Sequence, residues 1–184
     1  MGEHDMDTDD DPDAFFGAFK KRLTETDEIA NVILKGHLIA ESALNDIICV
    51  IFFHPEHIPE TWLLFERTVQ IVRAMSLRTN NYPGWDGVLA LNSLRNEIAH
   101  KHAGLGRQKK MDRLRQACLA NLMPEKAKLH EGDSDCEMAV LACAGCAGFL
   151  AHVEDDFRAL RSHIDELDAK INPNKERVPI KPRP

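Results

Sequence analysis

The spacing of apolar residues predicts helices along almost the whole chain. In the segment 27–53, apolar residues recur every three or four positions, the period of one buried helix face. These positions are Ile29, Val32, Ile33, Ile39, Ala40, Ala43, Leu44, Ile47 and Ile51. His37 and Glu41 stand within this pattern four residues apart, so they share a face of the helix one turn from each other.

The remaining segments also read as helices separated by short breaks. Helices are expected over 13–23, 60–77, 85–103, 107–122 and from 134 to about 168. Proline and glycine mark the breaks between them, and Ser134 with Glu137 forms a capping box that starts the last helix. The stretch 124–133 is expected to be a loop. Because no strand pattern is visible, the sequence predicts one all-α bundle of about five main helices.

Charge separates the ends of the chain from its middle. Of the 30 acidic residues, seven lie in residues 1–13, and the other 23 equal the number of lysines and arginines. We therefore expect a disordered acidic leader at 1–13, a single helical bundle domain at 14–170 and a basic, proline-rich tail at 171–184. Net charge alone neither supports nor excludes a nucleic-acid partner.

The compartment follows from the start of the chain and from its cysteines. The first residues lack the basic and apolar stretches of a secretory signal, and no long uninterrupted apolar run predicts a spanning helix. The five cysteines are odd in number, which favours a reduced compartment over a disulfide framework. We expect a cytoplasmic protein without membrane attachment.

Cys143 and Cys146 form a C-x-x-C motif, which in other contexts can bind zinc. Here the motif lies in an apolar helix rich in alanine and glycine and has no second ligand pair, unlike most structural zinc sites. Close packing of another helix against the small residues Ala144, Gly145 and Gly148 is the better interpretation, and that helix could come from the same subunit or a partner. No metal or other cofactor is expected.

The spacing R-x4-H occurs twice, at Arg95–His100 and at Arg158–His163. The composition gives such pairs easily by chance, so their surroundings must distinguish them. The second pair lies among alternating charges that are typical of a solvated helix face. Phosphate-binding glycine loops, H-E-x-x-H and G-x-S-x-G are missing from the sequence.

The first pair lies in LRNEIAHKH, near the end of an otherwise apolar helix. Arg95 and His100 are separated by roughly 140° around the helix, whereas Asn96 and His100 are four apart and align. These three side chains therefore point in neighbouring directions around the last turns of the helix. An ordinary structural role remains open, in which Arg95 pairs with an acid such as Glu41 and His100 caps the helix.

A basic stretch follows this motif directly. Six of the residues from Lys101 to Arg115 are lysine or arginine, against one aspartate. Such a stretch can hold a polyanion, although a solvated face is the alternative. The candidate RNA-binding residues are Lys101, His102, Arg107, Lys109, Lys110 and Arg113.

LRNEIAH resembles the R-N-x-x-A-H form of the R-x4–6-H signature of the HEPN superfamily, the higher eukaryotes and prokaryotes nucleotide-binding domains. The order of helices is similar over roughly residues 26–122, and the mannitol operon repressor family shares a similar layout. The resemblance implies an all-α homodimer with a metal-independent endoribonuclease site that pairs two motif copies. It assigns the catalytic positions to Arg95 and His100, a polar catalytic position to Asn96, and supporting positions to Glu41 and His37.

Three functions are consistent with this resemblance. The first is an RNA-cleaving enzyme of toxin or defence type, with an antitoxin or operon partner protein. The second is a regulator or RNA- or nucleotide-binding module without catalysis. The third is an interaction protein with no ligand site.

Overall fold

The computed structural model describes residues 27–59, 61, 63–100 and 105–176, and these residues form an all-α bundle. The helices are α2 (Glu28–Ile51), the 3-10 turn η1 (Pro55–His57), α3 (Phe65–Met75), α4 (Gly84–His100), α5 (Leu105–Ala120), α6 (Pro124–Leu129) and α7 (Asp135–Ile171). No strand occurs among the described residues, which confirms the predicted fold class. The helix expected over 13–23 and the acidic leader lie outside the described residues.

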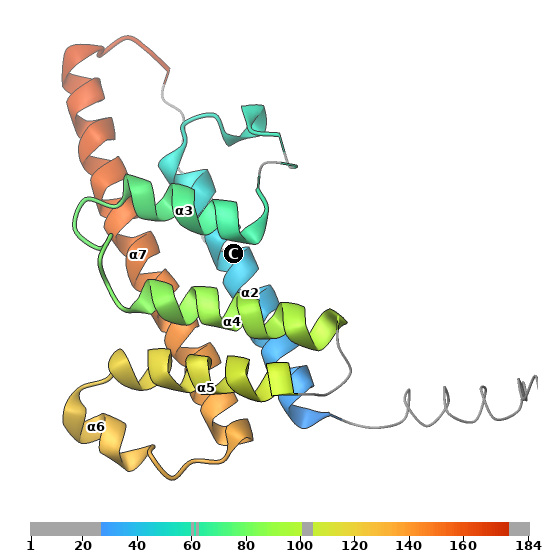
Figure 1. The fold of residues 1–184 in the computed structure, drawn as a ribbon. Coiled ribbons are helices and arrows are strands. Elements are labelled where there is room, and N and C mark those ends of the chain that lie inside the picture. Colours follow the sequence, from blue (N-terminus) through green and yellow to red (C-terminus); the bar gives the residue numbers. More distant parts are fainter. Residues whose placement is uncertain (1–26, 60, 62, 101–104, 177–184) are drawn as a thin grey trace, which may run out of the picture.

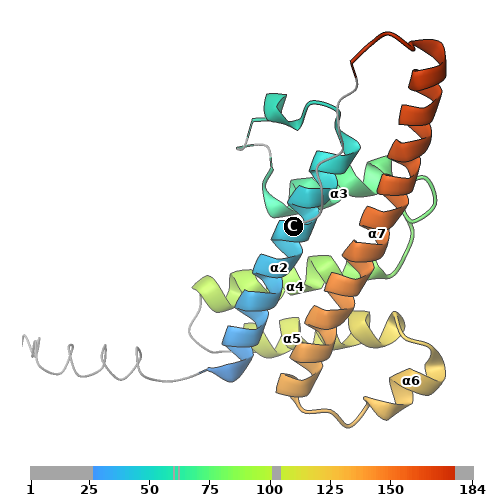
Figure 2. The same cartoon turned by 180° about the vertical axis from the view of Figure 1, so that it is seen from behind.

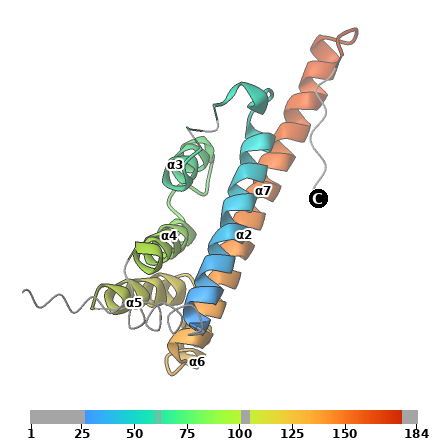
Figure 3. The same ribbon diagram turned by 90° about the vertical axis from the view of Figure 1, so that its right-hand side faces the viewer.

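Two long helices, α2 and α7, run parallel and side by side (Figures 1 and 3). The thiol of Cys143 donates to the carbonyl of Val32 at 3.8 Å, and Nη1 of Arg161 donates to the carbonyl of Val50 at 3.3 Å. Both contacts join residues 111 positions apart in the sequence. The two helices therefore keep one register over the distance from Val32 to Val50, about 27 Å at 1.5 Å per residue.

The α2–α7 contact depends on a glycine. A Cβ placed on Gly36 would lie 2.8 Å from the Cβ of Cys143 and closer still to its Sγ, so no larger residue fits without movement. By contrast, a Cβ on Gly145 or Gly148 meets nothing within 4 Å. The close packing predicted at Ala144, Gly145 and Gly148 is not made by any helix of the described part of the chain, where these residues are exposed. The close contact on this part of α7 lies at Cys143 and comes from α2.

Helices α3, α4 and α5 cross one face of this pair, as the views from the side and from behind show (Figures 2 and 3). The α4 helix is anchored by Trp85, which is fully buried and donates from Nε1 to the carbonyl of Thr79 at 2.7 Å. The Trp85 ring also meets Phe149 of α7 edge-on, with 4.8 Å between ring centroids. A buried aromatic with a satisfied N–H fixes the position of the first turn of α4.

Several predicted boundaries differ from the structure. Helix α3 begins at Phe65 instead of residue 60, and α7 continues to Ile171 instead of ending near 168. The stretch 124–133, predicted as a loop, contains α6. Pro124 occupies the first turn of α6, where its missing N–H is not needed by the helix. The capping box at Ser134 and Glu137 is confirmed.

By length and composition, α7 contains an 18-residue window that could cross a membrane. The sequence predicts no membrane-spanning helix, because it contains no uninterrupted apolar run of that length. Within the fold, 39% of this window is buried, and residues such as Leu150 and Val153 are fully enclosed. A core helix of a bundle meets the same criteria, and α7 packs against α2, α4 and α5.

We expect Gly36→Ala to lower the free energy of unfolding by about 1–3 kcal/mol, because the added methyl group overpacks the α2–α7 contact. The matched control is Gly148→Ala, which adds the same methyl group to an open position and should raise stability by up to about 1 kcal/mol through helix propensity. Urea denaturation measures both variants. Equal effects of the two substitutions would contradict this account of the helix pair.

Candidate functional site

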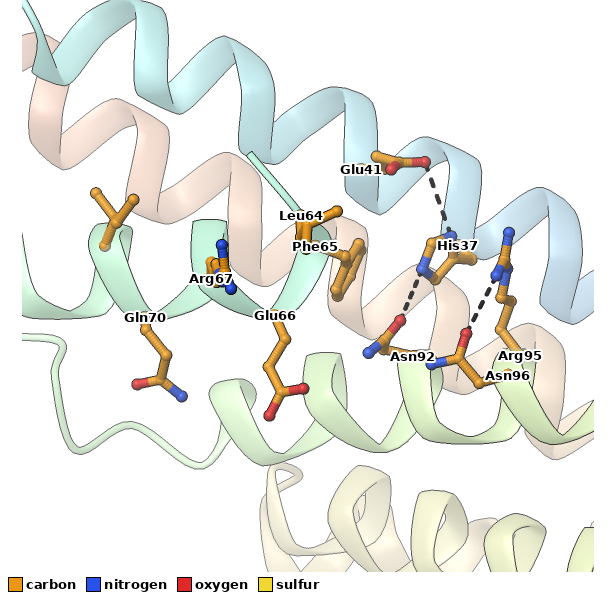
Figure 4. Close-up of a pocket in the computed structure, with 11 residues that line it drawn as sticks. His37, Glu41, Leu64, Phe65, Glu66, Arg67, Gln70, Asn92, Arg95 and Asn96 are labelled. Atoms are coloured by element: carbon orange, nitrogen blue, oxygen red, sulfur yellow. Dashed lines mark hydrogen bonds and ion pairs between the residues drawn. The ribbon is translucent and has the colours of Figure 1, made fainter. Parts of the chain in front are cut away.

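A pocket of about 930 Å³ opens between α2, α3 and α4 (Figure 4). Its lining residues are His37, Glu41, Leu64, Phe65, Glu66, Arg67, Gln70, Ile71, Asn92, Arg95 and Asn96. Arg95 and Asn96 from the α4 motif thus meet His37 and Glu41 from α2 at one cavity. These are four of the residues that the sequence singles out, brought together from two distant segments.

His37 joins the two walls of the pocket. It is 4% exposed, and its Nε2 lies 3.1 Å from Oδ1 of Asn92 on α4. Its ring also stacks on Phe65 of α3, with 4.3 Å between ring centroids. Because the Asn92 oxygen accepts, the neutral ring carries its proton on Nε2, and Nδ1 faces Glu41 at 4.0 Å.

The environment of His37 favours the neutral imidazole. Burial lowers its pKa below the ordinary value, and the positive charge of Arg95 acts in the same direction. The hydrogen bond to Asn92 and the charge of Glu41 oppose this lowering of the pKa but do not overcome it. At neutral pH the ring is therefore an uncharged link between α2, α3 and α4.

Arg95 and Asn96 form the motif side of the pocket. Nη1 of Arg95 donates to Oδ1 of Asn96 at 3.1 Å. No carboxylate of a described residue lies within the 4.0 Å ion-pair distance of Arg95, so the alternative pairing with Glu41 is not formed. The guanidinium keeps donors that an anionic ligand could use.

His100 is the last residue of α4. Its backbone is helical, and it follows Asn92 and Asn96 at intervals of four residues, which puts position 100 on the same stripe of the helix. The His100 side chain lies outside the described part of the structure. Lys101 and His102, two of the candidate RNA-binding residues, also lie outside the described residues.

The basic residues of α5 do not line the pocket, because α5 packs on the side of α4 away from α3 (Figure 3). Arg107 makes a bidentate ion pair with Asp27, the N-cap of α2, and this hydrogen bonding lowers the pKa of the Asp27 carboxyl. Nζ of Lys110 donates to Oγ of Ser93 at 2.5 Å. Lys109 and Arg113 are exposed. Arg107 therefore has a structural role between α2 and α5.

The pocket includes residues that the sequence did not indicate. Glu66, Arg67 and Gln70 form its α3 wall and are exposed on that helix, where a polar residue carries no signal of a site. Asn92 was identifiable in principle, because it lies one helical turn before Asn96 on the same stripe. Its role became evident only through its contact with His37.

The second R-x4-H pair belongs to a different environment. Arg158 forms a salt bridge at 2.6 Å with Glu154, which is buried on α7. The side chain of His163 is 74% exposed. Neither residue lines the pocket. Arg158 belongs to an ion pair within α7, and His163 lies on the surface of that helix.

The C-x-x-C motif lacks the character of a metal site. Burial raises the pKa of Cys143 to about 11 and that of Cys146 to about 12. Both thiols are therefore protonated at neutral pH, so zinc would have to displace two protons in order to bind them. Among the described residues, neither cysteine belongs to a cluster whose donor atoms could hold a metal ion together.

The fold and the pocket define an all-α protein with a cavity between three helices, lined by both polar and apolar side chains. In comparisons with family models, curated proteins and solved structures, nothing matches this chain. Functional inference therefore rests on the geometry of the pocket and on the residues that form it.

We expect the pH dependence of stability to depend on His37. An unfolded histidine titrates near pH ~6.5, whereas the pKa of folded His37 is lower. As the pH falls from about 7 to 5, the unfolded state binds a proton that the folded state resists, so the free energy of unfolding decreases.

Urea denaturation of His37→Gln across this pH range should show a shallower decrease than the parent protein. The control is His163→Gln, a substitution at a largely exposed histidine, which should keep the parent's slope. An unchanged slope in His37→Gln would show that this ring is not protonated preferentially in the unfolded state.

Proposed function

We propose that this protein is a HEPN-like, metal-independent endoribonuclease in which Arg95, His100 and Asn96 form the catalytic motif. One observation carries the proposal. The pocket joins the motif on α4 to His37 and Glu41 on α2, the two positions to which the resemblance assigns supporting roles. Arg95 also lacks a carboxylate partner among the described residues, as an anion-binding arginine requires.

Cleavage would use the ribose 2′-hydroxyl as an internal nucleophile. His100 takes the proton from the 2′-hydroxyl, the 2′-oxygen attacks the adjacent phosphorus, and the bond from phosphorus to the 5′-oxygen breaks. The leaving oxygen receives a proton from the second His100 of the paired site, giving a 2′,3′-cyclic phosphate and a 5′-hydroxyl. An imidazole with a pKa near ~6.5 suits either transfer. DNA lacks the nucleophile and is not a substrate.

The other pocket residues would bind and orient the RNA. Arg95 stabilises the negative charge that develops on the phosphate, and Arg67 adds a second cation from the opposite wall. Asn96 orients the phosphate or the histidine. His37 is a positioning residue, because its contact with Asn92 holds the motif stripe of α4 against α2.

The complete site would require a homodimer that brings two copies of the motif together. Lys101, His102, Lys109 and Arg113 would extend the RNA-binding surface beyond the pocket. Lys110 donates to Ser93, and Arg107 is paired with Asp27, so RNA would compete with these contacts for both side chains. An antitoxin or operon partner protein would regulate an enzyme of this toxin or defence type in the cytoplasm.

A non-catalytic regulator or nucleotide-binding module is the second candidate, and the composition of the pocket favours it in one respect. Leu64, Phe65 and Ile71 provide an apolar wall suited to a nucleobase, while Glu41 and Glu66 place acceptors where ribose hydroxyls could donate. Such a site binds a nucleotide without needing His100. Binding without cleavage would support this second function.

We expect His100→Ala and Arg95→Ala each to reduce cleavage of a long single-stranded RNA by at least about 100-fold, the typical size of a general acid–base or electrostatic contribution. Gel analysis of end-labelled RNA would measure the rate and identify the cyclic phosphate end.

The second R-x4-H pair provides the control for this experiment. His163→Ala removes the exposed histidine of the second R-x4-H pair and should leave the cleavage rate unchanged. Arg78→Ala removes an exposed arginine outside this pocket and should also leave the cleavage rate unchanged. Equal rates in the parent protein and His100→Ala, or no cleavage by either, would remove the catalytic proposal.

Treatment with a chelator should leave RNA cleavage within about twofold of the untreated rate, because the 2′-hydroxyl replaces a metal-activated water. The same labelled RNA and initial-rate measurement apply. Loss of cleavage that returns on adding a divalent ion, with thermal unfolding unchanged by the chelator, would indicate a metal-dependent mechanism instead.

A further inference from the structure

The connection between α2 and α3 carries the sequence His-Pro-Glu-His at residues 54–57, in which His54 is the N-cap of the 3-10 turn η1 (Pro55–His57). The N–H of His57 donates to the carbonyl of His54 at 3.2 Å, and that of Ile58 donates to the carbonyl of Pro55 at 3.0 Å. Pro55 restricts the backbone at the first position of the turn. The rings of His54 and His57 lie near each other, with 6.0 Å between their centroids.

The side chains of this turn bring three donor atoms together. Oε1 of Glu56 lies 3.0 Å from Nδ1 of His54 and 4.0 Å from Nε2 of His57. All three atoms lie within 4.8 Å of one another. Tetrahedral coordination with bonds of about 2.0–2.1 Å needs donors roughly 3.4 Å apart. A shift of about an ångström would reach that geometry.

The three side chains are free to make this shift. Their exposed fractions are 58% for His54, 60% for Glu56 and 80% for His57, so no packed neighbour holds their rotamers. The backbone hydrogen bonds of the turn fix the positions from which they extend. Fixing these side chains on a metal ion would cost about 0.5–1.5 kcal/mol each in lost rotamer freedom, which the metal–ligand bonds would offset.

The donor chemistry is that of a borderline metal ion. Two imidazoles and one carboxylate form the protein ligand set of many zinc sites that keep an open position. The carboxylate oxygen of Glu56 lies between the two imidazoles, so all three donors face one another at the turn.

We propose that His54, Glu56 and His57 bind a divalent transition-metal ion of the zinc class, with water completing the coordination. This site goes beyond the proposed ribonuclease function and is independent of it. The ion would link His54, Glu56 and His57 within the turn that follows α2 and precedes α3. Because both helices wall the pocket, the ion stabilises the fold around the pocket without entering the chemistry.

The test uses the full chain after chelator treatment and dialysis, titrated with Zn²⁺ alone by calorimetry and by thermal unfolding. The double variant H54A/H57A should weaken the strongest Zn²⁺ binding by at least about tenfold and lose the rise in Tm that Zn²⁺ gives the parent protein. Glu56→Gln should weaken binding through loss of the carboxylate and serves as a second variant with both histidines retained.

The matched control is H152A/H163A, which removes two exposed histidines that each lie near a single carboxylate. It should bind Zn²⁺ within about twofold of the parent protein, since each of these residues offers too few neighbouring ligands. Equal Zn²⁺ affinity in H54A/H57A and the parent, with binding retained by the cysteines or other histidines, would overturn the proposal. RNA cleavage by H54A/H57A is measured separately, so failure of either proposal is distinguishable.

Discussion

The parallel contact between α2 and α7 is the constraint on which the rest of the structure depends. Gly36 lets the two backbones approach each other beside Cys143. Two hydrogen bonds between α2 and α7 join residues with the same separation in sequence, which shows that the helices stay in register from one to the other. Two close-packed helices form a rigid surface against which other helices can pack. Helices α3, α4 and α5 pack on one face of this surface, and the gap between the first two, beside α2, becomes the pocket.

The pocket combines a fixed interior with adjustable polar groups at its mouth. His37 is buried and neutral, and it touches both α3 and α4, so its ring sets the relation between the three walls. Arg67 and Glu66 are exposed on α3 and can move toward a ligand. The proposed RNA cleavage would use this combination, because a phosphate would be held at a fixed distance from the catalytic base while the substrate enters and leaves.

The order and kind of helices could be predicted from the sequence because their signals are local. Apolar spacing identified α2 and α7, and the capping box located the start of α7 to the residue. The short helix α6 was missed because a few residues carry no period, and the α3 wall of the pocket was missed because exposed polar residues look alike in sequence. The association of His37 with Arg95 came from a family resemblance, because the sequence between these residues does not indicate how far apart they lie in the folded chain.

The sequence by itself determined that the chain is helical, which faces are apolar and which residues could take part in phosphate chemistry. The tertiary structure decided which of these residues share a cavity. It enclosed His37 with Asn92, turned Arg107 toward Asp27 and left the second arginine–histidine pair on the surface of α7. The physical reason is that helix period follows from neighbours along the chain, whereas a pocket depends on how closely separate helices approach.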